Sequence, residues 1–262
     1  MSRDFTRAKY RELLIGLQTA GYSFITFAEY CKGNRPEQHV ILRHDVDLLP
    51  YHSLETAKIE HTLGIRAVYY FRAVPESWND TVIKEIASLG HEVGYHYESL
   101  TTCNGNIEAA YEDFRKNLFA LRQLTAVETI CMHGSPRSPY DSKDIWKKYS
   151  YKNLGIIGEP YFDTDFSQSF YLTDTGRCWD GYKVSVRDKI PTYQDEWITK
   201  GWIFHSTDEI ILAAKNRTLP KKLMITTHPQ RWNDKTSRWL GEYIMQNAKN
   251  VVKKILIKQK GQ

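Results

Sequence analysis

Short apolar runs, of the kind that form buried strands, alternate along this chain with longer segments of helical periodicity. The candidate strands lie at 40–46, 66–71, 92–97, 129–133, 202–205 and 223–227. The candidate helices lie at about 4–20, 51–63, 78–89, 106–124, 141–150, 207–215 and 232–257. Alternation at this spacing is typical of a parallel sheet whose strands are joined by crossover helices. The pattern therefore predicts an α/β fold, either a closed barrel or an open doubly wound sheet.

The composition is that of a folded chain and excludes disorder. With 262 residues, 41% hydrophobic and 26% charged, the chain suits one large α/β barrel or two small domains. The net charge is +5, and the sequence has no acidic residue after Glu242. Five lysines lie in that last segment, namely Lys249, Lys253, Lys254, Lys258 and Lys260. We therefore expect no nucleic-acid binding by the rest of the chain, and a C-terminal helix with a solvated charged face.

The expected location is the cytoplasm. The N-terminal residues lack the apolar run of a secretory signal, and no stretch has the length and hydropathy of a membrane span. The four cysteines show no paired spacing, which predicts free thiols in a reducing compartment. Nothing in the pattern indicates an oligomeric state.

Charged side chains share one face at the end of the first candidate strand. Because side chains alternate along a strand, Arg43, Asp45 and Asp47 point one way, and His44 and Val46 point the other. Charges on a buried strand must be paired or bound to a metal. Two neighbouring carboxylates also repel each other, and a bound cation relieves that repulsion.

Histidines end three further candidate strands, at His96, His133 and His228. If the strands are parallel neighbours, these imidazoles meet the two aspartates at the carboxyl edge, where α/β barrels hold their active sites. Imidazole and carboxylate ligands with one open position are typical of a catalytic zinc site, although other transition metals also fit. His44 and His91 lie on the opposite face, and we expect them to be structural. The simpler alternative for each histidine is a hydrogen-bonded structural role.

Four segments in order resemble the polysaccharide deacetylase family, which is carbohydrate esterase family four, over about residues 40 to 230. They are Arg43-His-Asp-Val-Asp47, Gly90-His-Glu-Val-Gly-Tyr-His96, Arg137-Ser-Pro-Tyr140 and Met224-Ile-Thr-Thr-His228. The resemblance implies a distorted TIM-like barrel of seven β/α units in a single domain. Residues 1–39 would form a helical segment packed on the barrel, and residues 40–262 the barrel itself, with rim loops at about 155–200.

The resemblance also implies roles for individual residues. Asp45 would be the general base, Asp47 and His96 would be metal ligands, and His228 would be the general acid. Arg137 would orient the base, and Tyr140 would line the catalytic groove. The implied activity is metal-dependent hydrolysis of an N-acetyl or related acyl group, a linear amide, on a sugar or sugar precursor.

Leu100 departs from the family pattern, because it lies four residues after His96, where the family has a second metal-binding histidine. His133 is our first candidate for the third ligand, since it ends the adjacent strand. Glu98, which shares a face with His96, is the second. Further candidates are Glu159 and Asp163.

The candidate substrate-binding residues are Arg43, Tyr140, Trp179 and Trp232. Aromatic side chains in rim loops either stack on a sugar ring or pack the loop, and the sequence leaves both open. Asp174 and Arg177 are expected to pair and hold the loop before Trp179. Two other functions stay open. One is a divergent, non-catalytic barrel that binds a glycan or sugar precursor, and the other is a hydrolase of a non-sugar C–N amide.

Overall fold

The computed structural model describes residues 3–135, 138–180 and 188–260, and its backbone divides into two compact units. The central unit comprises Ile25–Arg35 and Ile41–Thr164. The terminal unit comprises Met1–Phe24, Pro36–Val40 and Asp165–Gln262. The sequence expectation of a boundary between residues 39 and 40 stays a prediction.

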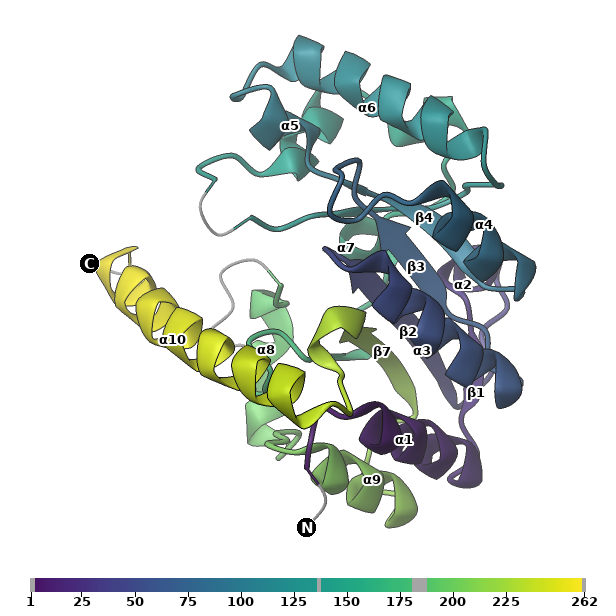
Figure 1. The fold of residues 1–262 in the computed structure, drawn as a ribbon, viewed down its shortest axis with the longest axis vertical. Helices are drawn as coiled ribbons and strands as arrows, with labels where there is room; N and C mark the ends of the chain where they lie inside the picture. Colours follow the sequence, from purple (N-terminus) through teal and green to yellow (C-terminus); the bar gives the residue numbers. More distant parts are fainter. Residues whose placement is uncertain (1–2, 136–137, 181–187, 261–262) are drawn as a thin grey trace. The chain divides into compact units, whose positions relative to one another are not determined.

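The central unit is built on parallel strands (Figure 1). Strand β2 (His39–Val46) belongs to this unit from Ile41 onward. The other strands are β3 (Val68–Phe71), β4 (Glu92–Tyr97) and β5 (Ile130–Met132). They pair in the order β2, β3, β4 and β5. Its helices are α2 (Phe27–Cys31), α3 (Pro50–Thr62), α4 (Asp80–Ser88), α5 (Ser99–Thr102), α6 (Ile107–Arg122) and α7 (Pro160–Asp163), with 3-10 helices η1 (Ser142–Lys147) and η2 (Tyr151–Leu154).

Short polar side chains set where the helices of the central unit begin. The Asn79 side chain accepts the Val82 N–H at 3.0 Å before α4, and the Asn106 side chain accepts the Ala109 N–H at 2.9 Å before α6. Such caps satisfy backbone donors that a helix leaves unpaired at its start. The apolar stripe of each helix then faces inward, as with the fully buried Phe114 of α6.

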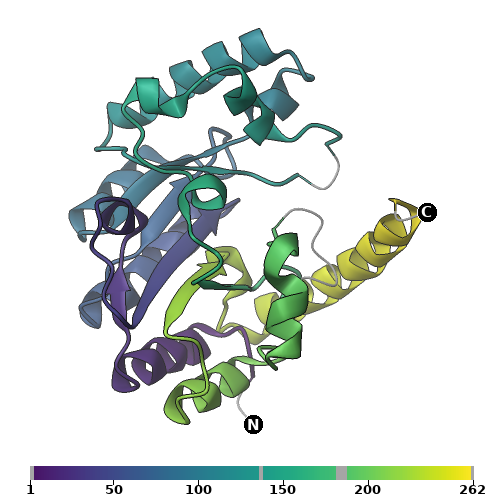
Figure 2. The same cartoon turned by 180° about the vertical axis from the view of Figure 1, so that it is seen from behind.

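The terminal unit repeats the arrangement on a smaller scale. Its strands β6 (Phe170–Thr173) and β7 (Lys222–Thr227) are parallel. Helix α1 (Arg7–Thr19) lies beside α9 (Thr207–Lys215), as Figure 2 shows from behind, and the close approach is made at Gly16 against Ile211. The remaining elements are α8 (Pro191–Thr199), η4 (Pro229–Arg231) and α10 (Thr236–Lys260), while β1 (Ser23–Ile25) spans the unit boundary.

The predicted α/β class is confirmed, and the parallel strand–helix repeats are those of a distorted TIM-like barrel. Most predicted elements are present within a few residues of their expected bounds, and 92–97 and 207–215 match β4 and α9. The expected helix at 141–150 is the 3-10 helix η1 instead. In the described residues, no helix combines the length and hydropathy needed to cross a membrane.

The predicted strand at 202–205 is wrong, and β6 replaces it beside β7. The Trp202 N–H donates to the Trp197 carbonyl at 2.9 Å, which closes the end of α8. The rings of Trp202 and Phe204 pack on Phe170 of β6, with centroids 5.5 and 6.1 Å apart. The apolar character of this segment therefore reflects packing against a strand.

One face of the central strands carries the polar side chains in register. Asp45 of β2 lies opposite Tyr70 of β3, which lies opposite Gly94 of β4. A Cβ atom at Gly94 would come within 2.4 Å of the Tyr70 ring and 2.9 Å of the Thr129 carbonyl oxygen. Gly94 therefore leaves the space that the Tyr70 ring fills.

We expect Gly94→Ala to lower the free energy of unfolding by about 1–3 kcal/mol, because the added methyl overpacks a rigid ring and a backbone oxygen. Gly241→Ala on α10 is the matched control, since a Cβ there meets no atom within 4 Å and alanine favours the helix. Urea denaturation of both variants measures the effect. Equal stability of the two variants would contradict the account of Gly94.

Candidate functional site

Arg43 and Asp45 form a buried ion pair on β2. The Arg43 Nε donates to Asp45 Oδ1 at 2.8 Å, and its Nη2 donates to Oδ2 at 2.6 Å. The two side chains are two residues apart and therefore share a strand face. Each carboxylate oxygen thus receives a charge-assisted hydrogen bond, which fixes the orientation of the Asp45 carboxylate. Arg43, expected to contact substrate, is only 1% exposed and is committed to this pair.

Asp47, His96 and His133 bring one potential ligand atom each within 4.8 Å of one another. His96 Nε2 lies 3.8 Å from Asp47 Oδ1, and His133 Nε2 lies 3.4 Å from the same oxygen. Asp47 follows β2, His96 lies on β4 and His133 follows β5. Their meeting follows from the parallel pairing, because the carboxyl ends of parallel strands share one edge of a sheet.

A second layer of side chains orients His133. Glu98 Oε2 lies 3.0 Å from His133 Nδ1, and the Arg72 Nε donates to Glu98 Oε1 at 2.9 Å. Burial alone would raise the pKa of Glu98, but the hydrogen bond and charge of His133, with the charge of Arg72, lower it to about 2. The ionised Glu98 accepts a hydrogen bond from His133 Nδ1, which directs the other ring nitrogen, Nε2, toward Asp47. Glu98, the second candidate for the third ligand, contacts His133 and Arg72 in this structure.

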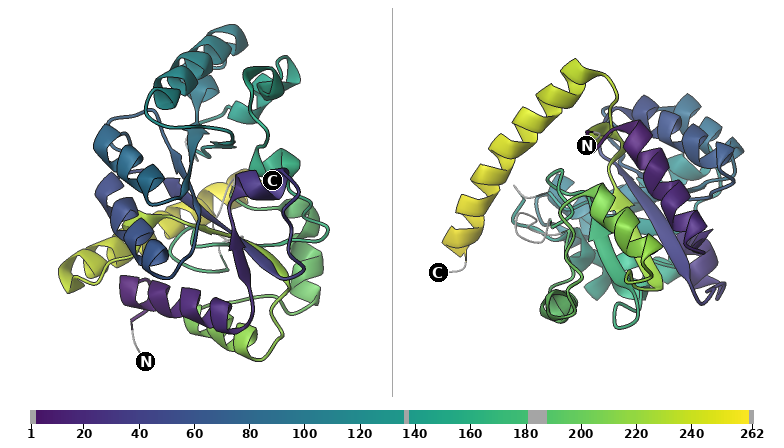
Figure 3. Two further views of the ribbon diagram at one scale, coloured as in Figure 1. Left: turned by 90° about the vertical axis from the view of Figure 1, so that its right-hand side faces the viewer. Right: turned by 90° about the horizontal axis from the view of Figure 1, so that it is seen from below.

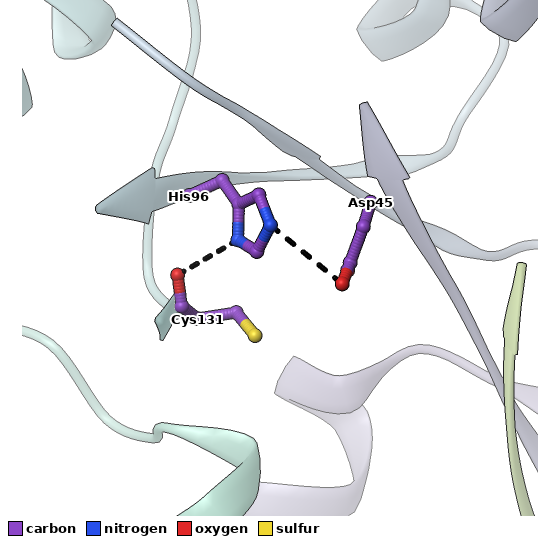
Figure 4. Close-up of side chains that lie close together, drawn as sticks. All are labelled: Asp45, His96 and Cys131. Carbon is purple, nitrogen blue, oxygen red and sulfur yellow. Dashed lines mark hydrogen bonds and ion pairs between the residues drawn. The ribbon is translucent and has the colours of Figure 1, made fainter. Parts of the chain in front are cut away.

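His96 is held in the same way by a backbone group. Its Nδ1 lies 2.9 Å from the Cys131 carbonyl oxygen, which only accepts, so Nδ1 carries the proton (Figure 4). Its Nε2 lies 3.6 Å from Asp45 Oδ2. Burial, followed by the nearby His133, lowers the pKa of His96 well below its ordinary value, although Asp47 opposes the shift. His96 is therefore neutral at pH 7, which is the form that binds metals.

Cys131 is a potential ligand that the sequence analysis did not name. Its Sγ joins Asp45 and His96 in a second group whose ligand atoms lie within 4.8 Å of one another, with all three residues buried (Figure 4). Its position was visible in the sequence, because Cys131 shares a strand face with His133. The side chains of the two groups meet at His96.

The structure gives the remaining third-ligand candidates other partners. Glu159 accepts the backbone N–H groups of Met132 at 3.0 Å and Tyr161 at 2.6 Å, and burial raises its pKa to about 7. Asp163 accepts the Tyr151 hydroxyl at 2.7 Å. Leu100, in the position of the missing histidine, is buried in an apolar cluster of the central unit. Of the third-ligand candidates, His133, which follows β5, lies in the group with Asp47 and His96.

His44 and His91, expected to be structural, lie in a buried network on the opposite face of the strands. His44 Nε2 is 2.7 Å from Glu60 Oε1, and the Tyr69 hydroxyl donates to Glu60 Oε2 at 2.7 Å. His91 Nε2 is 3.0 Å from the Ala57 carbonyl oxygen. These contacts join α3 to β2, β3 and the start of β4.

His228 is built into the terminal unit, where it follows β7. Its Nδ1 lies 2.6 Å from Oδ1 of Asp174, which follows the neighbouring strand β6. Arg231 donates to the same oxygen at 2.8 Å, and the Trp232 indole donates to Oδ2 at 2.7 Å. Burial alone would raise the pKa of Asp174, but the charges of His228 and Arg231 outweigh it and lower the pKa. An ionised carboxylate therefore holds the His228 ring.

The expected pair between Asp174 and Arg177 is replaced by the Asp174–Arg231 pair. The Arg177 backbone N–H still donates to the Asp174 carbonyl at 2.8 Å. Its guanidinium instead lies 4.3 Å from the ring centroid of Trp239 and donates to the Trp239 carbonyl. The sequence analysis did not foresee Arg231 as the partner.

Trp179 and Trp232 lie in the core of the terminal unit, 4% and 1% exposed. Both pack on Phe5, and the Trp179 indole donates to the Thr207 hydroxyl at 2.9 Å. Neither ring presents a face to a substrate in this structure. Tyr140 is 36% exposed. Arg137 lies outside the described residues.

Sequence comparison finds no matching family model and no matching curated protein. Among solved structures, the chain is similar to a carbohydrate esterase of family four from Streptococcus mutans, with 15% identity, 90% of each chain covered and a TM-score of 0.45. For PdaA of Bacillus subtilis, a family 4 carbohydrate esterase, the values are 11% identity, 90% of this chain and 83% of that chain, and a TM-score of 0.37.

A pseudoenzyme of the same esterase family from Bacillus anthracis is also similar, with 13% identity and a TM-score of 0.41. The match covers 80% of this chain, which spans only 60% of the pseudoenzyme's length. What this chain can do therefore has to be argued from its own side chains.

We expect Asp174→Asn to lower the free energy of unfolding by about 3–5 kcal/mol at neutral pH, because it leaves the buried Arg231 without its carboxylate. The folded-state pKa of Asp174 is lowered, so its contribution is present above its unfolded pKa and is lost as pH falls through the folded value. The difference from wild type should therefore shrink in acid. Denaturation curves from pH 7 downward test this, with exposed Asp234→Asn as the control.

Proposed function

We propose that this chain is a metal-dependent hydrolase that removes an N-acetyl or related acyl group from a sugar or sugar precursor. The observation that carries the proposal is the grouping of Asp47, His96 and His133 beside a separately clamped carboxylate, Asp45. The three grouped side chains could bind a cation, and the adjacent Asp45 carboxylate could act as a base. The resemblance of the four sequence segments to polysaccharide deacetylases supports the choice of an acylated sugar.

The donor set fits a divalent ion. One carboxylate and two imidazoles are the ligands of a catalytic zinc site that keeps an open position, and Zn²⁺ is therefore the proposed metal. Asp47, His96 and His133 would hold it. A divalent cation bound there supplies Lewis acidity, which acidifies a water and polarises an acyl carbonyl. The neutral state of His96 and the contact of Glu98 with His133 prepare both imidazoles as ligands.

Asp45 is the proposed general base. Arg43 holds its carboxylate, and the orienting role that the resemblance gave to Arg137 stays a prediction. The two hydrogen bonds from Arg43 keep the Asp45 carboxylate aligned to accept a proton from water. His228 is the proposed general acid, which protonates the leaving amine. Asp174 at its Nδ1 stabilises the charged ring that this role requires. Tyr140 is the proposed contact to the sugar.

The proposed setting is the cytoplasm, with soluble or carrier-bound sugar precursors as substrates. Support comes from the four cysteines, which are all free, as is typical of a reducing compartment.

For the metal site, we expect the purified chain to hold one divalent ion, and His133→Ala to lose it. Glu98→Gln should weaken metal affinity about 10–100-fold, because it removes the charge that orients His133. Elemental analysis and titration with a chelator measure both effects. Exposed His205→Ala is the matched control. A wild-type chain that takes up no divalent ion but binds glycans would instead indicate a non-catalytic binding protein.

For the reaction, acetate release from an N-acetylated sugar should fall about 100-fold or more in Asp45→Asn and in His228→Ala, since each removes a proton-transfer group. Exposed Glu112→Gln should retain wild-type activity. Circular dichroism melting of each variant separates loss of chemistry from loss of folding. Wild-type rates in both folded variants would refute these role assignments.

A further inference from the structure

Helix α10 contacts its own unit through one face. Trp239 donates its indole N–H to the Asp4 carbonyl at 2.7 Å and stacks on Tyr243, one turn further along. The Arg177 guanidinium lies over both rings, 4.3 and 5.5 Å from their centroids. Asn250 donates to the Gly176 carbonyl at 2.8 Å. Residues 239, 243 and 250 are spaced by four and seven, so they share one side of the helix.

A different side of the helix is apolar and faces solvent. Leu240, Ile244 and Val251 share a side by the same four- and seven-residue spacing. These three side chains are between 47 and 60% exposed. Figure 3 shows α10 as one continuous helix that stands apart from α1 and α9. A stripe of large apolar side chains on a helix already docked by another face marks an interaction surface, because single exposed residues are ordinary but aligned ones are not.

The charge of the segment indicates what covers the stripe. In the sequence, five lysines and no acidic residue follow Glu242, and apolar residues recur between them as far as Ile257. A second copy of this helix would bring ten lysines together, which like-charge repulsion opposes. An anionic surface instead neutralises them. Basic helices with an apolar stripe lie in the interface of anionic bilayers, where burial of the apolar side chains and attraction to the headgroups act together.

We propose that α10 attaches this chain to an anionic membrane surface as an interfacial amphipathic helix. The Leu240, Ile244 and Val251 side chains enter the headgroup region, and the net positive charge of the sequence after Glu242 attracts the helix to the lipid phosphates. The polar and aromatic face around Trp239 keeps the helix on its unit. The proposal is independent of the hydrolase assignment, since it uses none of the residues of that site.

Sedimentation with vesicles tests the proposal. The full chain should bind vesicles of equal parts phosphatidylcholine and phosphatidylglycerol, and should bind pure phosphatidylcholine at least about tenfold more weakly. Raising the salt to about 0.5 M should reduce binding to the anionic vesicles, because it screens the lysines. Absence of binding to anionic vesicles, or equal binding to both compositions, would overturn the proposal.

Matched variants separate the two contributions. The apolar pair Ile244→Ser and Val251→Ser should weaken anionic-vesicle binding about tenfold or more, whereas exposed Phe119→Ser and Leu212→Ser on other helices should not.

A second variant tests the contribution of the positive charge. Lys249→Gln, Lys253→Gln and Lys254→Gln together should weaken binding at least about tenfold. The control removes as many charges elsewhere, by replacing Lys147, Lys200 and Lys221 with glutamine. If the variant and its control lose vesicle binding equally, net charge alone explains the binding, which contradicts a specific role for α10. Light scattering tests whether a second copy of the chain covers the stripe instead. If the wild-type chain is a dimer, and the Ile244→Ser and Val251→Ser variant is a monomer, the stripe binds a second copy and not a membrane.

Discussion

The arrangement of the polar side chains in the central unit depends on an ion pair that is buried on one face of β2. Removing a guanidinium and a carboxylate from water costs several kcal/mol each, and only close, fully bonded geometry offsets that cost. Arg43 and Asp45 achieve it because they are two residues apart on a strand and meet in two parallel hydrogen bonds. With its own cation two residues away, Asp45 does not need a metal for neutralisation. The neighbouring Asp47 is then the carboxylate that is placed among imidazoles.

The periodicity of the sequence predicted the side chains that gather in the central unit, because strand alternation and parallel pairing are enough to bring Asp47, His96 and His133 to one edge. It did not predict the supporting contacts. Arg72 reaches Glu98 from a strand-end loop, and nothing in the local pattern of either residue specifies the other. Spacing identifies residues on one face of one strand, whereas contacts between loops depend on how the chain folds back.

In the terminal unit, residue type alone left the sequence analysis with two open alternatives for the aromatic side chains. Trp179 and Trp232 suit a sugar ring and a core equally well, and the structure uses them to fill the core around Phe5. The Asp174–His228 contact was missed because it depends on β6, a four-residue aromatic strand without polar alternation. Once β6 and β7 are parallel neighbours, their carboxyl ends place Asp174 beside His228 for the same reason that Asp47 meets His96.

Leu100, four residues after His96, belongs to an apolar cluster of the central unit. At the start of α5, a side chain in this position packs into an apolar cluster with Ala110 and Ile145, where a histidine would lose its hydrogen bonds to water. His133 at the end of β5 reaches the same group from a strand, and Glu98 fixes its orientation. A ligand held by a strand end and an ionised carboxylate is better preorganised than one on a four-residue helix. The proposed metal site therefore takes its second imidazole from a strand end and does not depend on α5.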